Sequence, residues 1–187
     1  MKKSQTHHMA YIAILSGLSA VLMFLDFPLP FFPPFLKFDV SDAVVFASSI
    51  FVGPIGMLAI IVIRSLLHWV LKGAELGVPV GQVVSIISSI SFCLVAYFIN
   101  QKAKIVKNEK YRLALGLCAG SFVMMAIMFV INYFWVTPFY FTLGNMPLPT
   151  NYFQYMLLYI PFNLLKGLLN SLVVFLLYPH LRKIKLT

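Results

Sequence analysis

Three polar side chains near the end of the sequence have the spacing of a binding site inside a membrane. The segment PFNLLKGLLNS places Asn163, Lys166 and Asn170 at helical positions i, i+3 and i+7, so all three project from one helix face. An ionisable residue within an apolar span is costly and usually functional, which makes Lys166 a candidate for ligand binding. The structural alternative is that Lys166 only pairs with Asp26 or Asp39 and holds a nearby loop.

The chemistry of this set indicates a ligand rather than a reaction. Amides and one ammonium among aromatic side chains suit a ligand that is partly planar and apolar, with several hydroxyls or carbonyls and little net charge. The sequence lacks the H-E-x-x-H, Walker A and G-x-S-x-G motifs, and its acidic residues are few and scattered. Cys93 and Cys118 lie in apolar runs without metal-ligand spacing. We therefore predict no catalytic residue, no metal and no cofactor. Active transport would need energy from a partner or an ion gradient.

The composition predicts an integral membrane protein. Hydrophobic residues make up 61% of the 187 residues and charged residues only 10%, whereas soluble domains are about one quarter charged. The net charge of +9 does not indicate nucleic-acid binding, because the basic residues fall in short segments between apolar runs. Basic segments of this kind set the orientation of membrane spans, so we predict that the partner of the chain is the lipid bilayer and not a nucleic acid.

The predicted fold is an all-α membrane domain that comprises residues 1–187, with six transmembrane helices and both termini in the cytoplasm. The region 43–71 can be one long span or two short ones broken at Gly53-Pro54. Two spans place the basic segment 101–112 on the same side as the basic N-terminus, as the positive-inside rule prefers. The six predicted spans are residues 9–25, 43–52, 55–71, 80–99, 113–136 and 152–181, and residues 137–151 are predicted to form an outer loop.

The stretch Asp26–Asp42 lies between the first two spans and cannot be a continuous helix. It contains four of the 11 prolines together with several phenylalanines and four charged residues. Proline removes a backbone donor and disfavours the helical conformation of the residue before it. We expect a stiff, aromatic, proline-rich loop at a membrane face, either a lid over a ligand site or a connector.

Small residues in the first span permit the close approach of another helix. Ala13 and Gly17 are four residues apart, as are Ser16 and Ala20. The pattern fits either the docking of a partner protein or the packing of a neighbouring span.

Other polar residues within the predicted spans also have more than one interpretation. Arg64 is expensive in a bilayer and must face a partner subunit, snorkel to the interface or pair with a buried carbonyl. Ser85, Ser88 and Ser89 share a helical face that either borders a wet cavity or eases helix packing. Asn132 is a strong polar residue near the outer end of the fifth span.

Two segments carry a resemblance to a known family. The stretch FPLPFFPPFLKFDVSD, which follows a first span with small residues, and NLLKG in the sixth span resemble the riboflavin-specific S components of energy-coupling-factor (ECF) transporters. The resemblance covers essentially the whole chain. It implies a six-helix subunit of the cell membrane that is not an enzyme and captures riboflavin from outside. It also implies docking to a transmembrane coupling subunit and two cytoplasmic ATPases, followed by toppling of the S component to release the vitamin inside.

Carried over to this sequence, the resemblance implies roles for particular residues. Partner docking falls on Ala13 and Gly17, where Gly17 replaces the alanine that is usual in the family. Phe35 and Phe38 are expected to cover the flat ring of the ligand. The ligand region lies in the first loop and the outer halves of the later spans, which here gives Lys37, Asp39, Asn132, Asn163 and Lys166. The last two would bond the polar end of the ring or the ribityl hydroxyls.

Three alternatives stay open at this point. The chain could be an S component for another vitamin, because a shared fold does not determine the ligand. It could be an intramembrane enzyme acting on lipid or peptide, although an acid–base constellation is missing. It could also be a membrane scaffold without a ligand, in which Asn163, Lys166 and Asn170 only connect helices.

Overall fold

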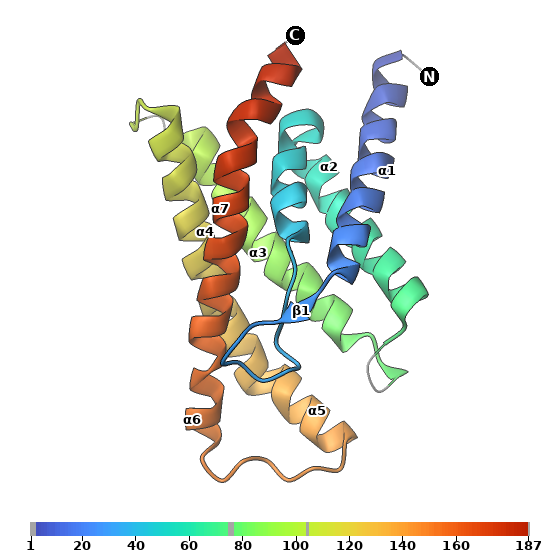
Figure 1. The fold of residues 1–187 in the computed structure, drawn as a ribbon, viewed down its shortest axis with the longest axis vertical. Coiled ribbons are helices and arrows are strands. Elements are labelled where there is room, and N and C mark those ends of the chain that lie inside the picture. The colour runs from blue at the N-terminus through green and yellow to red at the C-terminus, as the bar shows by residue number, and fades with distance from the viewer. Residues whose placement is uncertain (1–2, 75–76, 104, 187) are drawn as a thin grey trace.

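The computed structural model describes residues 3–74, 77–103 and 105–186, which form an elongated helical bundle (Figure 1). Apolar runs form the long helices, and the prolines and glycines lie at or near most of the breaks between them. The elements are α1 (Lys3–Phe24), β1 (Phe27–Pro28), β2 (Lys37–Phe38), α2 (Ser41–Lys72), α3 (Val80–Lys102), α4 (Glu109–Ile131), the π-helical segment η2 (Asn132–Val136), α5 (Thr137–Leu143), α6 (Tyr152–Leu157) and α7 (Tyr159–Leu186).

Five helical stretches of the described chain are long and apolar enough to cross a membrane. The second of them, α2, is interrupted at Gly53, whose backbone φ of 66° is non-helical, and Pro54 follows directly. The halves before and after Gly53 run in opposite directions (Figure 1). The first half, residues 41–52, spans roughly 18 Å at 1.5 Å per residue, which is short of the 30 Å hydrocarbon core. The description of this region as two separate spans stays a prediction.

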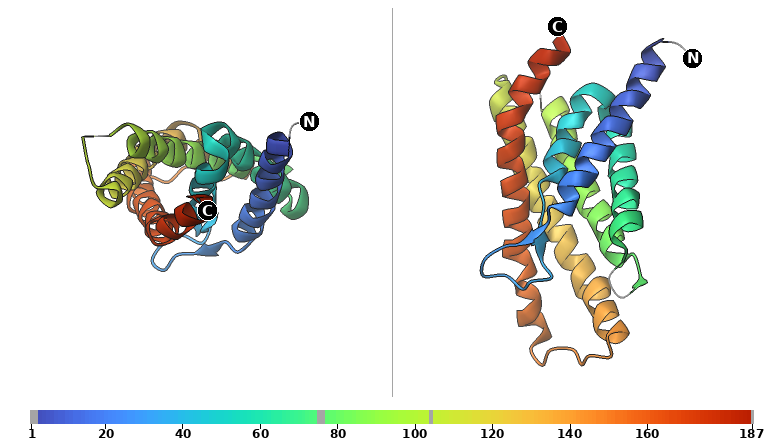
Figure 2. Two further views of the ribbon diagram at one scale, coloured as in Figure 1. Left: turned by 90° about the horizontal axis from the view of Figure 1, so that it is seen from above. Right: turned by 45° about the vertical axis from the view of Figure 1, so that its right-hand side comes forward.

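Both ends of the described chain lie at the same end of the bundle (Figures 1 and 2). The reversal within α2 and the α3–α4 connection are also there, whereas α5 and α6 lie at the opposite end. Lys2 and Lys104, which contributed to the predicted topology, lie outside the described residues.

The proline-rich loop contains the only strands of the described residues, so the fold is mostly rather than entirely α-helical. Phe27 pairs with Phe38, and Pro28 pairs with Lys37, in an antiparallel arrangement. The all-α prediction missed this pair because it considered proline only as a helix breaker. A residue before proline also favours the extended conformation that strands need, and Phe27 precedes Pro28.

The fourth membrane-capable stretch continues beyond its predicted end into the segment expected to be an outer loop. It runs from Glu109 to Leu143 through α4, η2 and α5. Pro138 is tolerated because it lies in the first turn of α5, where the backbone N–H that proline lacks would have no partner within that helix. The π-helical turn η2 lies directly before α5 and accommodates the altered backbone hydrogen bonding near Pro138.

The core consists of two groups of buried apolar side chains. One group lies between α2, α3, α4 and α7 and includes Phe46, Met57 and Phe92. The other joins the proline-rich loop to α6 and α7 through Leu36, Phe38 and other residues. The loop is therefore packed onto the bundle rather than extended into solvent.

Glycines permit the closest approach between α3 and α4. A Cβ atom on Gly116 would lie 2.6 Å from the backbone oxygen of Ala96, and one on Gly120 would lie 2.6 Å from that of Phe92. Because a backbone oxygen cannot move aside alone, Gly116→Ala should force the helices apart and lower the free energy of unfolding by about 1–3 kcal/mol.

The loss of stability is measured as a drop in the thermal unfolding temperature of the purified protein in detergent. Gly17→Ala is the matched control, because no atom lies within 4 Å of a Cβ at Gly17. The close-packing explanation is wrong if both variants unfold at the wild-type temperature.

Candidate functional site

A cavity of about 720 Å³ lies toward the end of the bundle opposite the termini. Its volume falls within the range of small-molecule sites, which is about 300–1,000 Å³. The proline-rich loop, α2, α3, the α4–η2–α5 stretch and α7 all contribute to its wall. Six of the seven residues predicted to bind a ligand line it: Phe35, Lys37, Asp39, Asn132, Asn163 and Lys166.

Phe38, the seventh of these residues, is not among the lining side chains. It is 4% exposed and packs edge-to-face on Phe27, with 5.6 Å between the ring centroids. Successive residues of a strand point to opposite faces, so Phe38 turns away from the cavity that its neighbour Lys37 lines. Phe35, which is half exposed, lines the cavity and lies 6.4 Å from the ring of Tyr159.

Lys166 and Asp39 form an ion pair at the inner wall of the cavity, with 3.4 Å between Nζ and Oδ2. The other carboxylate oxygen, Oδ1, accepts hydrogen bonds from the backbone N–H of Ser41, at 3.0 Å, and from its hydroxyl. Burial opposes ionisation of Asp39, but the charges of Lys166 and Arg64 and the Ser41 hydrogen bonds outweigh it, so its pKa is lowered. Asp39 is therefore a carboxylate at neutral pH.

Asn132 at the end of α4 and Asn163 on α7 both contribute amides to the cavity. Asn132 Nδ2 donates to the backbone oxygen of Met128 at 2.7 Å, and Asn163 Nδ2 donates to that of Tyr159 at 2.8 Å. A primary amide has two N–H donors and an acceptor oxygen, so each side chain retains one donor and one acceptor for a ligand.

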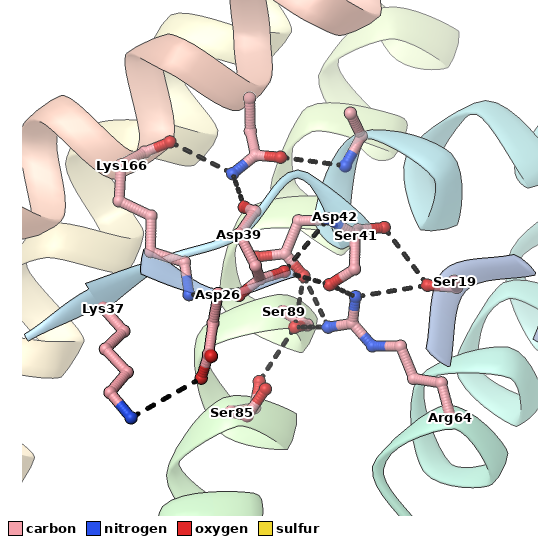
Figure 3. Close-up of polar contacts among 12 residues, drawn as sticks. Ser19, Asp26, Lys37, Asp39, Ser41, Asp42, Arg64, Ser85, Ser89 and Lys166 are labelled. Atoms are coloured by element: carbon pink, nitrogen blue, oxygen red, sulfur yellow. Dashed lines mark hydrogen bonds and ion pairs between the residues drawn. The ribbon is translucent and has the colours of Figure 1, made fainter. Parts of the chain in front are cut away.

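Asn170, which shares a helix face with Asn163 and Lys166, connects two elements of the fold through hydrogen bonds to the backbone. Its Nδ2 donates to the backbone oxygen of Asp39 at 3.2 Å, and its Oδ1 accepts from the backbone N–H of Ala43 at 3.1 Å. These bonds join α7 to the start of α2 and hold Asp39 beside Lys166 (Figure 3).

Arg64 lies behind this wall and not on the outer surface. Its side chain is 1% exposed and forms a 2.6 Å ion pair with Asp42 on the other half of α2. Arg64 also donates to the hydroxyls of Ser41 and Ser89, and more weakly to that of Ser19 on α1 at 3.4 Å (Figure 3). A carboxylate and hydroxyls, rather than a partner subunit or a lone carbonyl, thus accept its hydrogen bonds.

The rim of the cavity carries a second group of charges. Asp26 accepts two hydrogen bonds of 2.8 Å from Lys72 and lies 3.9 Å from Lys37. These side chains are one-fifth to one-third exposed, in contrast to the buried pairs deeper in the wall. The bridges connect the proline-rich loop to the end of α2.

Sequence reasoning missed several lining residues. Tyr155, Tyr159 and Phe162 line the cavity together with Asn163 and Lys166. They lie at helical spacing along the stretch that joins α6 to α7, so the stripe that predicted Asn163 and Lys166 could have been extended toward the N-terminus. His68 was also missed, and it is buried and lines the cavity.

The two pairs of small residues on α1 face different surroundings. Ser16 and Ala20 are buried against the bundle, with exposures of 1% and 4%. Ala13 is exposed, and Gly17 is partly exposed with open space where a Cβ would stand. Intramolecular packing therefore accounts for Ser16 and Ala20 but not for Ala13 and Gly17.

These features define a multi-pass membrane protein with a cavity whose wall is partly aromatic and partly charged. The described residues contain no group of three or more His, Cys, Asp or Glu side chains that could hold a metal ion. The model of the family described as ECF transporter, substrate-specific component, matches residues 7–178. The chain belongs to this family, and it is thus a component of a transporter in the cell membrane rather than an enzyme.

Named relatives and a solved structure are similar over nearly the whole chain. "Riboflavin transporter RibU" of Staphylococcus aureus (strain TCH60) is 31% identical over 97% of this chain and 93% of that protein. "Riboflavin transporter FmnP" of Bacillus subtilis (strain 168) is 32% identical over 91% of this chain and 90% of that protein. A structure titled "Structure and mechanism of the S component of a bacterial ECF transporter" matches with a TM-score of 0.81 and 30% identity over 96% of this chain and 98% of that one.

Proposed function

We propose that this chain captures riboflavin in the 720 Å³ cavity as the binding subunit of an ECF transporter. The observation that carries the proposal is the joint presence of amide groups, lysine ammonium groups and a tyrosine-rich wall in a chain similar to named riboflavin transporters. Riboflavin combines a flat ring bearing carbonyls with a hydroxylated chain, so it needs stacking surfaces and neutral hydrogen-bonding groups. Lys37, Asp39, Asn132, Asn163 and Lys166 are the proposed polar contacts, and Phe35 covers the ring.

The proposed orientation has six spans, counting the halves of α2 separately, with both termini in the cytoplasm. The reversal at Gly53 supports this arrangement, as does the position of both ends of the described chain at one end of the bundle. The cavity then opens outward, and the proline-rich loop acts as its lid. Riboflavin is in this view a transported ligand and not a cofactor.

A flavin titration tests the proposal. The purified chain is stripped of bound flavin in detergent, and riboflavin is added while its fluorescence is recorded. A stoichiometric, saturable quench that other vitamins do not displace is the expected result. If the folded protein produces no quench, the riboflavin assignment fails, and the same cavity is tested with the other vitamins.

The open face of α1 is the proposed docking surface for a transmembrane coupling subunit, which would bring two cytoplasmic ATPases. Ala13 and Gly17 let a partner helix approach closely, because neither presents a bulky side chain. Ala13→Leu with Gly17→Leu should therefore abolish co-purification with the coupling subunit and ATP-driven uptake. Riboflavin affinity should stay within about twofold of wild type, because neither residue lines the cavity.

The control is Ala126→Leu, an exposed alanine on α4 that lies in a different helix. It should leave assembly and uptake intact. If the α1 variant assembles as well as wild type, the coupling subunit docks elsewhere.

A further inference from the structure

We propose that the α3 wall of the cavity is a subsite for a polyhydroxylated chain, while the ring of the ligand lies against the opposite wall. The subsite consists of Gln82, Ser85 and Ser88 on α3 with His68 on α2. The inference rests on the proposed function and assigns the two halves of riboflavin to different walls.

Unsatisfied polar atoms are concentrated on this wall. Both ring nitrogens of His68, the side-chain oxygen of Gln82 and the hydroxyl of Ser88 are buried without a hydrogen-bond partner among the described residues. His68 is 8% exposed and Ser88 4% exposed. A buried polar atom without a partner is unfavourable, so a ligand that pairs with these atoms supplies the missing hydrogen bonds.

The opposite wall differs because its polar groups are already partly paired. Lys166 pairs with Asp39, and the amides of Asn132 and Asn163 each donate to a backbone oxygen. That wall also carries the aromatic lining residues Phe35, Tyr155, Tyr159 and Phe162. Stacking surfaces and a few directed donors suit a flat heterocycle.

The α3 wall has no aromatic side chain among its lining residues, which are Gly81, Gln82, Val84, Ser85 and Ser88. It offers little for a ring to stack on. Gln82, Ser85 and Ser88 recur every three residues on one face of the helix and extend over about 9 Å at 1.5 Å per residue. An extended chain of several carbons can run along such a row.

The unpaired groups match hydroxyls better than charged groups. A neutral imidazole supplies one donor and one acceptor, the Gln82 oxygen accepts, and the Ser88 hydroxyl both donates and accepts. Hydroxyls on adjacent carbons also donate and accept, so each can pair with whichever atom faces it. An anionic group only accepts and would meet the acceptor oxygen of Gln82 unpaired.

The test compares two flavins that share the ring. Lumiflavin has a methyl group where riboflavin has its ribityl chain, so the ratio of their dissociation constants isolates the contribution of the chain. Dissociation constants for both are measured by fluorescence quenching with the full-length wild-type protein and with Ser88→Ala, His68→Leu and His68→Gln. Ser91→Ala is the matched control, because Ser91 lies on the same helix, bonds only the backbone oxygen of Ser88 and does not line the cavity.

Ser88→Ala and His68→Leu should each weaken riboflavin roughly three- to tenfold while lumiflavin stays within about twofold. His68→Gln, which keeps a donor and an acceptor, should recover part of the riboflavin affinity. Equal weakening of both flavins, or no change in either, overturns the subsite. If wild-type protein binds neither flavin, the proposed function itself fails, which is a distinct outcome.

Discussion

Lys166→Met is expected to lower the affinity for riboflavin roughly 10- to 150-fold, the range that corresponds to the loss of one hydrogen bond from a charged donor. Lys166 lines the cavity and points its ammonium at Asp39 from α7, so a ligand carbonyl can share the same donor group. Titration of the purified variant with riboflavin measures the loss.

The single variant also leaves the Asp39 carboxylate without its partner, and the effect on the loop must be separated from the effect on the ligand. The double variant Lys166→Met/Asp39→Asn removes both charges and keeps an amide oxygen for the hydrogen bonds from Ser41. The reference is Asp39→Asn alone, because Asp39 also lines the cavity. If Lys166 only holds the loop in place, the double variant should bind riboflavin as well as Asp39→Asn does. If Lys166 contacts the ligand, as we expect, the double variant should bind more weakly than Asp39→Asn.

The largest loss of stability is expected from Asp42→Asn. Arg64 and Asp42 are 1% and 2% exposed, so the substitution leaves a buried guanidinium without its ion-pair partner. Breaking a buried pair from one side costs about 3–5 kcal/mol, a large share of the stability of most domains. We expect little folded protein after solubilisation in detergent, measured by the thermal unfolding temperature and by the yield of monodisperse protein.

A double variant, Arg64→Met/Asp42→Leu, tests whether the unpaired charge is the cause. Replacement of a buried ion pair by apolar residues is often neutral, so this variant should recover much of the stability. Glu109→Gln is the surface control, because Glu109 is 56% exposed in its 3.8 Å pair with Arg112 and should change the unfolding temperature little. An Asp42→Asn protein as stable as wild type would show that the serine hydroxyls alone suffice for Arg64.

Local patterns in the sequence were sufficient to predict some of the residues that line the candidate site. Asn163 and Lys166 lie in one continuous helix, where spacing alone predicts a shared face, and the structure places both in the cavity wall. Hydropathy likewise indicated the membrane helices, because apolar length is a local property. Local patterns did not predict that Phe38 lies outside the cavity lining, because the direction of each side chain in the loop depends on strand pairing across the loop.

The partner of Arg64 could not be predicted in the same way. Asp42 is 22 residues away in the sequence and meets Arg64 only because the chain reverses between them. No helical or strand period connects two such positions. Two of the three hydroxyls that complete the arrangement come from α1 and α3, so the environment of Arg64 is a property of the assembled bundle.

The reversal at Gly53 also has a consequence for biosynthesis. Inserting one charged residue at the centre of an isolated span costs about 2.5–3.5 kcal/mol on scales measured with the translocon. The halves of α2 are adjacent in the sequence and antiparallel, so Arg64 and Asp42 can leave the translocon side by side as a neutral pair. We expect residues 41–72 to enter the bilayer as one hairpin, and Asp42→Asn should then reduce the inserted fraction of this segment in a translocation assay.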